Sequence, residues 1–153
     1  MVQTKKNSKN SLKIESIGII DSSKQGPVIP FLSSLISAGF PSSAENYLEK
    51  SLDLNDLLIK HASSTFFIRV IGNSMQDGGI NSGDILIVDR ALSIANNKIV
   101  VARLNDEFTV KRILIKDDKI YLVPDNKKYP PIEITSEIDF EIWGVVTFVI
   151  HQV

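Results

Sequence analysis

The sequence predicts a mostly β protein, in which an antiparallel sheet folds over into a barrel-like domain. Three observations predict this class. From Thr65 onward the chain consists of short runs rich in Val, Ile and Phe, which are residues that favour strands. Gly, Asn, Asp and Pro separate these runs at short intervals, as is typical of tight links between antiparallel strands. The chain before Thr65 lacks such runs, and it predicts short helices and a flexible N-terminal arm.

The arm is expected to comprise residues 1–38. Residues 1–12, "MVQTKKNSKNSL", are polar and lack periodicity, which predicts disorder. Residues 13–20, "KIESIGII", fit a short strand. Residues 21–30 contain one glycine and two prolines and predict a turn or an extended segment. In residues 31–41 apolar side chains recur at helix-like spacing, but the run is short. The arm should therefore be mostly extended, with one apolar patch that needs a surface to lie on.

Two short helices are predicted next. Ser42 is followed three residues later by Glu45, which is the pattern of a capping box, so a helix should begin there and run through "SSAENYLEKSL". Asp53 is suited to cap a second helix of one or two turns in "DLNDLLIKH".

Seven strands should follow these helices, because each run below is apolar, short and bounded by turn residues. They are "TFFIRVI", "DILIVDR", "NKIVVARL", "EFTVKRILI", "KIYLVP", "PPIEI" and "FEIWGVVTFVI".

Composition limits the classes of function. The 153 residues suit one domain with an arm, and the net charge is −1. Residues 1–38 contain five lysines and two acidic residues, which favours a solvated tail over strong direct DNA binding. The chain has no cysteine and two histidines, so neither a disulfide nor a metal site is expected. No apolar run approaches the roughly 20 residues of a membrane span, and a cytoplasmic location is expected.

One serine stands in an unusual setting. Ser74 lies in "VIGNSMQDGGINSGD", directly after an apolar strand and among four glycines. It is either an ordinary turn residue or an exposed nucleophile. A serine nucleophile needs a base that takes its proton. His61 and His151 are candidates, although neither has a distinctive context.

Lys111 is the other candidate base, since a desolvated lysine can also activate serine. In a strand over "EFTVKRILI", alternation sends the side chains of Lys111 and Arg112 in opposite directions. One of the two must then enter apolar surroundings, and burial lowers a lysine pKa. The alternative is that Lys111 is a solubilising residue on the strand surface.

Read together, these segments resemble the LexA/UmuD family of self-cleaving serine peptidases, peptidase family S24. The similarity covers residues 27–153 and includes "GNSMQDGGINSGDILIVDR", "DEFTVKRI" and "FEIWGVVTFVIHQV". It implies a LexA-type peptidase fold, with Ser74 as the nucleophile and Lys111 as the general base. Backbone N–H groups of Ser74 and Met75 would stabilise the oxyanion. Asn73 departs from the family pattern, in which aspartate is common before the serine.

The resemblance also implies a cleavage site. The family cuts between a small residue and glycine, which here is the bond between Ala38 and Gly39. Cleavage would separate the arm, residues 1–38, from a dimerisation domain, residues 39–153. The short chain before Gly39 favours the UmuD group over LexA and the phage repressors, although this arm is longer and richer in lysine than that group suggests.

The UmuD group implies particular partners. These are a second copy in a homodimer, the RecA filament on single-stranded DNA as co-protease, and a UmuC-type Y-family polymerase in the SOS response to DNA damage. No cofactor is implied. Two alternatives remain. One is a dimeric binding module, or a phage repressor or anti-repressor fragment, without proteolysis. The other is a type I signal peptidase, which would need an apolar membrane anchor.

Overall fold

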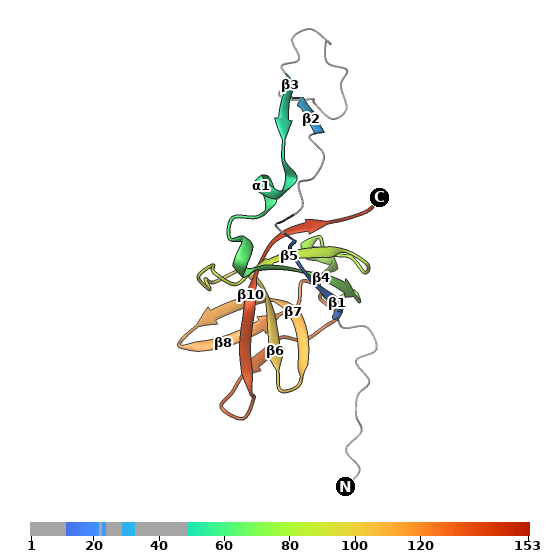
Figure 1. Ribbon diagram of the computed structural model, residues 1–153. Coiled ribbons are helices and arrows are strands. Elements are labelled where there is room, and N and C mark those ends of the chain that lie inside the picture. The colour runs from blue at the N-terminus through green and yellow to red at the C-terminus, as the bar shows by residue number, and fades with distance from the viewer. Residues whose placement is uncertain (1–11, 22, 24–28, 33–48) are drawn as a thin grey trace.

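The computed structural model describes residues 12–21, 23, 29–32 and 49–153, and their main element is one curled antiparallel sheet (Figure 1). The sheet has eight strands in the order β1-β4-β5-β10-β6-β7-β8-β9. The strands are β1 (Lys13–Ile19), β4 (Thr65–Ile71), β5 (Ile85–Asp89), β6 (Ile99–Leu104), β7 (Glu107–Lys116), β8 (Lys119–Val123), β9 (Ile132–Ile134) and β10 (Phe140–Ile150).

The predicted class and all seven predicted strands after Thr65 are confirmed. Each predicted run contains one strand of the sheet, and neighbouring strands pair antiparallel throughout. Asn105, Asp117 and Asp118 adopt positive φ angles in the links between strands. Asn and Asp tolerate this conformation better than most residues, so these turn residues fix where the strands end.

The long strand β10 curls the sheet. Its first half pairs with β6 and its second half with β5, and the register shifts between Ile142 and Gly144 and again between Val146 and Phe148. Such bulges bend a strand and increase its twist. Gly144 lies where a Cβ atom would come within 2.7 Å of Val88 Cγ1. A glycine is therefore required for β10 to approach β5 so closely.

The alternation of side chains divides the core into two apolar clusters. On β6, Val101 belongs to the first cluster, whereas its neighbours Val100 and Ala102 belong to the second. This is the period of two that a strand covered on both faces requires. The first cluster holds most of the buried residues of β4 and β5, together with Met75 and Val110. It is therefore the part of the core that lies next to Ser74.

The described residues near the N-terminus, 12–19, belong to the folded sheet. The predicted strand at residues 13–20 is confirmed as β1, which pairs antiparallel with β4 from Lys13 to Ile19. The prediction of disorder is wrong for Leu12, whose exposed fraction is 1% and which belongs to the first apolar cluster. Residues 1–11 lie outside the described residues.

A small second sheet corrects the helix predictions. Strand β2 (Ile29–Leu32) pairs with β3 (Glu49–Leu52), and Figure 1 shows this pair standing away from the eight-stranded sheet. The helix predicted from Ser42 is therefore wrong for residues 49–52, where pairing with a segment about 20 residues earlier determines the structure. The helix-like spacing that begins at residue 31 is likewise not followed in β2. The rest of these two segments, with Ala38 and Gly39, lies outside the described residues.

The second predicted helix is confirmed as α1 (Leu54–Leu58). The Asp53 side chain accepts a hydrogen bond from the backbone N–H of Asn55, as expected of an N-cap. A short 3₁₀ turn, η1 (Ala62–Ser64), leads into β4. In the part of the chain that the structure describes, no helix is long and apolar enough to cross a membrane.

Candidate active site

Ser74 lies in the tight connection between β4 and β5. The backbone N–H of Gly83 donates to Val70 O at 2.7 Å, and that of Gly72 donates to Ser82 Oγ at 3.1 Å. These bonds close the loop at its base. Gly72, Gly79 and Gly83 have φ angles of 111°, 83° and 95°. Residues with a Cβ atom rarely adopt such angles. The glycines around Ser74 thus make a turn at the end of a strand, as the sequence predicts.

The link between β8 and β9 holds this turn in place. The backbone N–H of Asp77 donates to Asp125 O at 2.8 Å, and Asn126 Nδ2 donates to Asn73 O at 2.8 Å. At Gly78 a Cβ atom would lie 2.2 Å from a carboxylate oxygen of Asp125. Gly78 is therefore needed for the close packing of the turn that carries Ser74 on the segment that carries Asp125.

Lys111 projects from β7 to Ser74. Its Nζ lies 3.0 Å from Ser74 Oγ, 2.7 Å from Thr109 Oγ1 and 3.0 Å from Val110 O. The exposed fraction of Lys111 is 4% and that of Ser74 is 0%. The structure thus brings the predicted nucleophile, Ser74, and the predicted base, Lys111, into contact, although 37 positions separate them in the sequence.

Burial changes the acid–base chemistry of this lysine. Desolvation lowers the pKa of Lys111 from 10.5 to about 8. Among the described residues, no carboxylate contacts its Nζ to oppose this effect. An amine with a pKa near 8 is neutral in about a tenth of the molecules at pH 7. The neutral amine can accept the proton of a hydroxyl group in hydrogen-bond contact.

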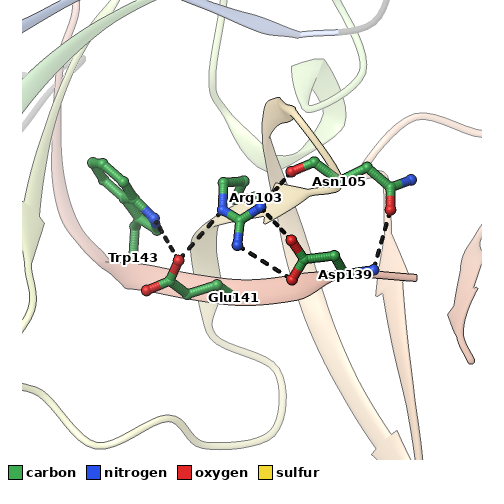
Figure 2. A network of polar contacts seen from close by, with 5 residues as sticks. All are labelled: Arg103, Asn105, Asp139, Glu141 and Trp143. Atoms are coloured by element: carbon green, nitrogen blue, oxygen red, sulfur yellow. Dashed lines mark hydrogen bonds and ion pairs between the residues drawn. The ribbon is translucent and has the colours of Figure 1, made fainter. Parts of the chain in front are cut away.

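A network at the turn between β6 and β7 fixes the start of the strand that carries Lys111 (Figure 2). Arg103 donates to Asp139 and Glu141 on the β10 side, with the shortest ion-pair distance at 2.7 Å. It also donates to Asn105 O. Trp143 Nε1 donates to Glu141. The Trp143 ring packs edge-on against the ring of Phe108 on β7, with 4.5 Å between the ring centroids. This network joins β6, β7 and β10 just before Thr109 and Lys111.

The two histidines that the sequence offered as bases are engaged elsewhere. His61 Nδ1 lies 2.6 Å from Asp89 Oδ2, and His151 Nδ1 lies 2.6 Å from Asp84 Oδ1. Neither contacts Ser74, whose side-chain partners among the described residues are Leu12 and Lys111. Within the described parts of the chain, His, Cys, Asp and Glu side chains do not gather in groups of three that could hold a metal ion.

The backbone N–H groups of Ser74 and Met75 are the third predicted group. In the described structure neither N–H donates to an acceptor, although both residues have an exposed fraction of 0%. A buried N–H without an acceptor is costly. The two groups are therefore hydrogen-bond donors at the serine turn that the described structure leaves unused.

A cavity of about 800 Å³ opens beside Lys111. It lies between β1 and the first half of β7, and apolar residues form much of its wall. Residues that line it include Ile14, Ile17, Leu104, Phe108 and Ile132. The cavity is large enough for several residues of an extended peptide, and Lys111 is one of its lining residues.

The sequence did not predict three contributors to this site. Thr109 contacts the amine of Lys111, Asp125 supports the serine turn, and the backbone N–H of Leu12 donates to Ser74 Oγ at 3.1 Å. Thr109 was detectable in principle, because it lies two residues from Lys111 on the same face of a strand. Leu12 and Asp125 reach the turn through long-range folding, for which the local sequence carries no signal.

Comparisons with known proteins identify the family of this chain. Residues 30–147 match the family model described as Peptidase S24-like. The chain is 48% identical over 120 residues to Protein MucA of Salmonella typhimurium, which covers 78% of this chain and 82% of MucA. It is 41% identical over 125 residues to Protein ImpA of Shigella flexneri, over 82% of this chain and 85% of ImpA. It is 38% identical over 132 residues to the LexA repressor of Hahella chejuensis, over 86% of this chain and 65% of the repressor.

A buried serine and lysine in contact, held at the turn of a curled antiparallel sheet, are features of the class of serine peptidases that use lysine as a base. The chain belongs to the peptidase S24-like family, whose members are in general self-cleaving serine peptidases. The resemblance inferred from the sequence is thereby confirmed at the level of the family.

Proposed function

We propose that this chain is a self-cleaving serine peptidase of the SOS response, in which Ser74 and Lys111 cut the bond between Ala38 and Gly39. The observation that carries the proposal is the 3.0 Å contact between Lys111 Nζ and Ser74 Oγ. The lysine is buried and its pKa is lowered to about 8. A solubilising lysine on a strand surface would have neither property.

The reaction follows from these groups. Neutral Lys111 accepts the hydroxyl proton of Ser74, and Oγ attacks the carbonyl carbon of Ala38. The N–H groups of Ser74 and Met75 stabilise the negative oxygen of the tetrahedral intermediate. The Lys111 ammonium then donates its proton to the nitrogen of Gly39 as the C–N bond breaks. Water, deprotonated by Lys111, hydrolyses the acyl group from Ser74, which regains its proton.

The segments on both sides of the cut have different roles in this proposal. Residues 1–38 form an arm that is removed, and residues 39–153 form the dimerisation domain. Because the substrate is tethered to the enzyme, its effective concentration is high and little affinity is needed. A RecA filament on single-stranded DNA accelerates the reaction. The shortened homodimer then joins a UmuC-type Y-family polymerase in the cytoplasm. The relatives named MucA and ImpA and the LexA repressor support membership of this group.

Intact-mass spectrometry of the full chain tests the proposal. The purified protein is incubated at pH 7 and pH 10, with and without RecA filaments, beside the Ser74→Ala variant. We expect two products whose masses correspond to residues 1–38 and 39–153, more of them at pH 10, and none from Ser74→Ala. An intact chain under every condition would contradict the proposal and favour a dimeric binding module without proteolysis.

A further inference from the structure

The nucleophile of the proposed reaction is covered by the chain's own N-terminal segment. Ser74 has an exposed fraction of 0%. The cavity beside the site reaches Lys111 but not Ser74. What lies against Ser74 Oγ is Leu12, whose backbone N–H donates to it at 3.1 Å. In this state no second peptide can reach Oγ unless Leu12 leaves.

Residues 12–19 are held there in two ways. Leu12 has an exposed fraction of 1% and belongs to the apolar cluster that also contains Val70, Met75 and Val110. The following strand, β1, adds to the edge of β4 in antiparallel register, with Ile17 opposite Ile68 and Ile19 opposite Phe66. Main-chain pairing at a sheet edge combined with an apolar anchor is the way in which extended peptides bind by strand addition.

The geometry of the contact with Ser74 is that of an inhibitor and not of a substrate. A peptide group is planar, and its N–H bond lies in that plane. A nucleophile that attacks the carbonyl carbon must approach from above or below the plane. Ser74 Oγ instead accepts the N–H of Leu12 at 3.1 Å from the nitrogen. The nucleophile of the proposed reaction is thus engaged by a peptide N–H group, a contact that does not lead to attack on a carbonyl carbon.

We propose that the edge of β4 and the surroundings of Ser74 form a binding site for an extended peptide with an apolar anchor residue, and that residues 12–19 occupy it as a built-in competitive inhibitor. This inference rests on the proposed function. The segment to be cut and residues 12–19 cannot both contact Ser74, so cleavage requires the release of Leu12. Any agent that removes β1 from the β4 edge accelerates cleavage.

The test compares two substitutions of the same kind in the full chain. Leu12→Asp places a charge in the apolar anchor site, whereas Ile94→Asp changes an apolar residue with an exposed fraction of 48% in the link between β5 and β6. Because a buried leucine side chain anchors the segment, we expect Leu12→Asp to be cut about tenfold faster or more than the unsubstituted chain at pH 8. Ile94→Asp should stay within about twofold, and Leu12→Ala should fall between the two.

Adding the inhibitor back sharpens the test. A synthetic peptide with the sequence of residues 8–20 should slow the cleavage of the Leu12→Asp variant in a concentration-dependent way. The same peptide with aspartate at the position of Leu12 should not slow it. Amide hydrogen exchange in the Ser74→Ala background, where no cutting occurs, provides the folding control. Leu12→Asp should increase exchange in residues 13–19 and leave β6, β7 and β8 protected.

The outcomes separate this inference from the proposed function. If the unsubstituted chain is cut and Leu12→Asp is cut no faster while its β1 exchanges freely, the inhibitory role is overturned and the proposed function stands. If the mass of the product shows cutting directly before Leu12, the segment is a substrate and the inference is wrong. If no variant is cut although β1 is released, the proposed function fails, and the inhibitory role fails with it.

Discussion

Lys111 and Arg112 are neighbours on β7, yet these two cations lie in opposite electrostatic surroundings. Lys111 has an exposed fraction of 4%, contacts hydroxyl and carbonyl oxygens, and has a lowered pKa because of desolvation. Arg112 donates to both carboxylate oxygens of Asp125 and to Asn97 O. The hydrogen bond to Asp125 and the charge of that carboxylate raise the pKa of Arg112.

The difference shows how one strand can carry both a lysine suited to proton transfer and an arginine that stabilises a neighbouring loop. Alternation along β7 directs the two side chains to different surroundings, so only one of them loses its proton near neutral pH. The other stays charged and holds Asp125, whose backbone O accepts from the N–H of Asp77 in the serine turn. Lys111 is thus suited to proton transfer, and Arg112 is suited to positioning the turn that carries Ser74.

The largest expected effect on the cleavage rate comes from replacing Lys111 by arginine, the residue type found at Arg112. Lys111→Arg replaces an amine that can lose its proton by a guanidinium that cannot. We expect the rate of cleavage between Ala38 and Gly39 to fall by about 100-fold or more, as is typical when a general base is lost. The measurement is a mass-spectrometric time course at pH 9. Lys116→Arg, at the exposed end of the same strand, is the matched control and should retain the rate.

Replacing each cation by methionine should change stability in opposite directions. At pH 7, Lys111→Met removes the cost of a buried charge and should raise the free energy of unfolding by about 1–3 kcal/mol. Arg112→Met removes the cation that pairs with the carboxylate of Asp125, whose side-chain exposed fraction is 15%. This variant should lower the free energy of unfolding by about 1–3 kcal/mol. Urea unfolding of both variants in the Ser74→Ala background measures these changes.

The gain from Lys111→Met should depend on pH in a defined direction. The folded pKa of Lys111, about 8, lies below the ordinary value of 10.5, so the unfolded chain binds more protons between these values. The stability of the lysine-containing protein therefore rises with pH across this window. The advantage of methionine should shrink over the same range. A constant difference between pH 7 and pH 10 would show that Lys111 does not titrate as described.

A smaller effect is expected at Thr109, which positions the amine. Thr109→Val keeps the shape but removes the oxygen at 2.7 Å from Lys111 Nζ. The maximal cleavage rate should fall about three- to tenfold, which corresponds to the loss of one hydrogen bond. Because this oxygen accepts from the ammonium form, the midpoint of the pH profile should also move down by about half a unit to one unit. Thr109→Ser should retain both the maximal rate and the midpoint of the pH profile. A fall in rate with an unchanged midpoint would indicate a structural defect and contradict this role of Thr109.

The sequence predicts the parts of this molecule whose structure is decided locally. The strands from Thr65 onward combine β-branched residues with turn residues between them, and all seven are present. Asp53 caps α1 as its type and position suggest. The burial of Lys111 follows from strand alternation in an apolar run, although alternation alone did not decide between Lys111 and Arg112 as the buried residue.

The parts that the sequence does not predict depend on distant partners. Residues 49–52 follow a capping pattern, but they pair with β2 and become a strand. Leu12 ends a polar run, and its burial comes from the sheet and from Ser74, which lies 62 residues away. Asp125 lies in a loop between two strands, and its importance arises only because the serine turn packs on it.

The most direct test of the account is the first-order rate of self-cleavage of the full chain from pH 6 to pH 11. If neutral Lys111 is the base for Ser74, the rate should rise about tenfold per pH unit below pH 8 and level off above it. Its midpoint should lie near the Lys111 pKa of about 8. A rate that is independent of pH, or a midpoint near 10.5, the ordinary lysine pKa, would contradict the claim that burial at the serine turn makes Lys111 the base.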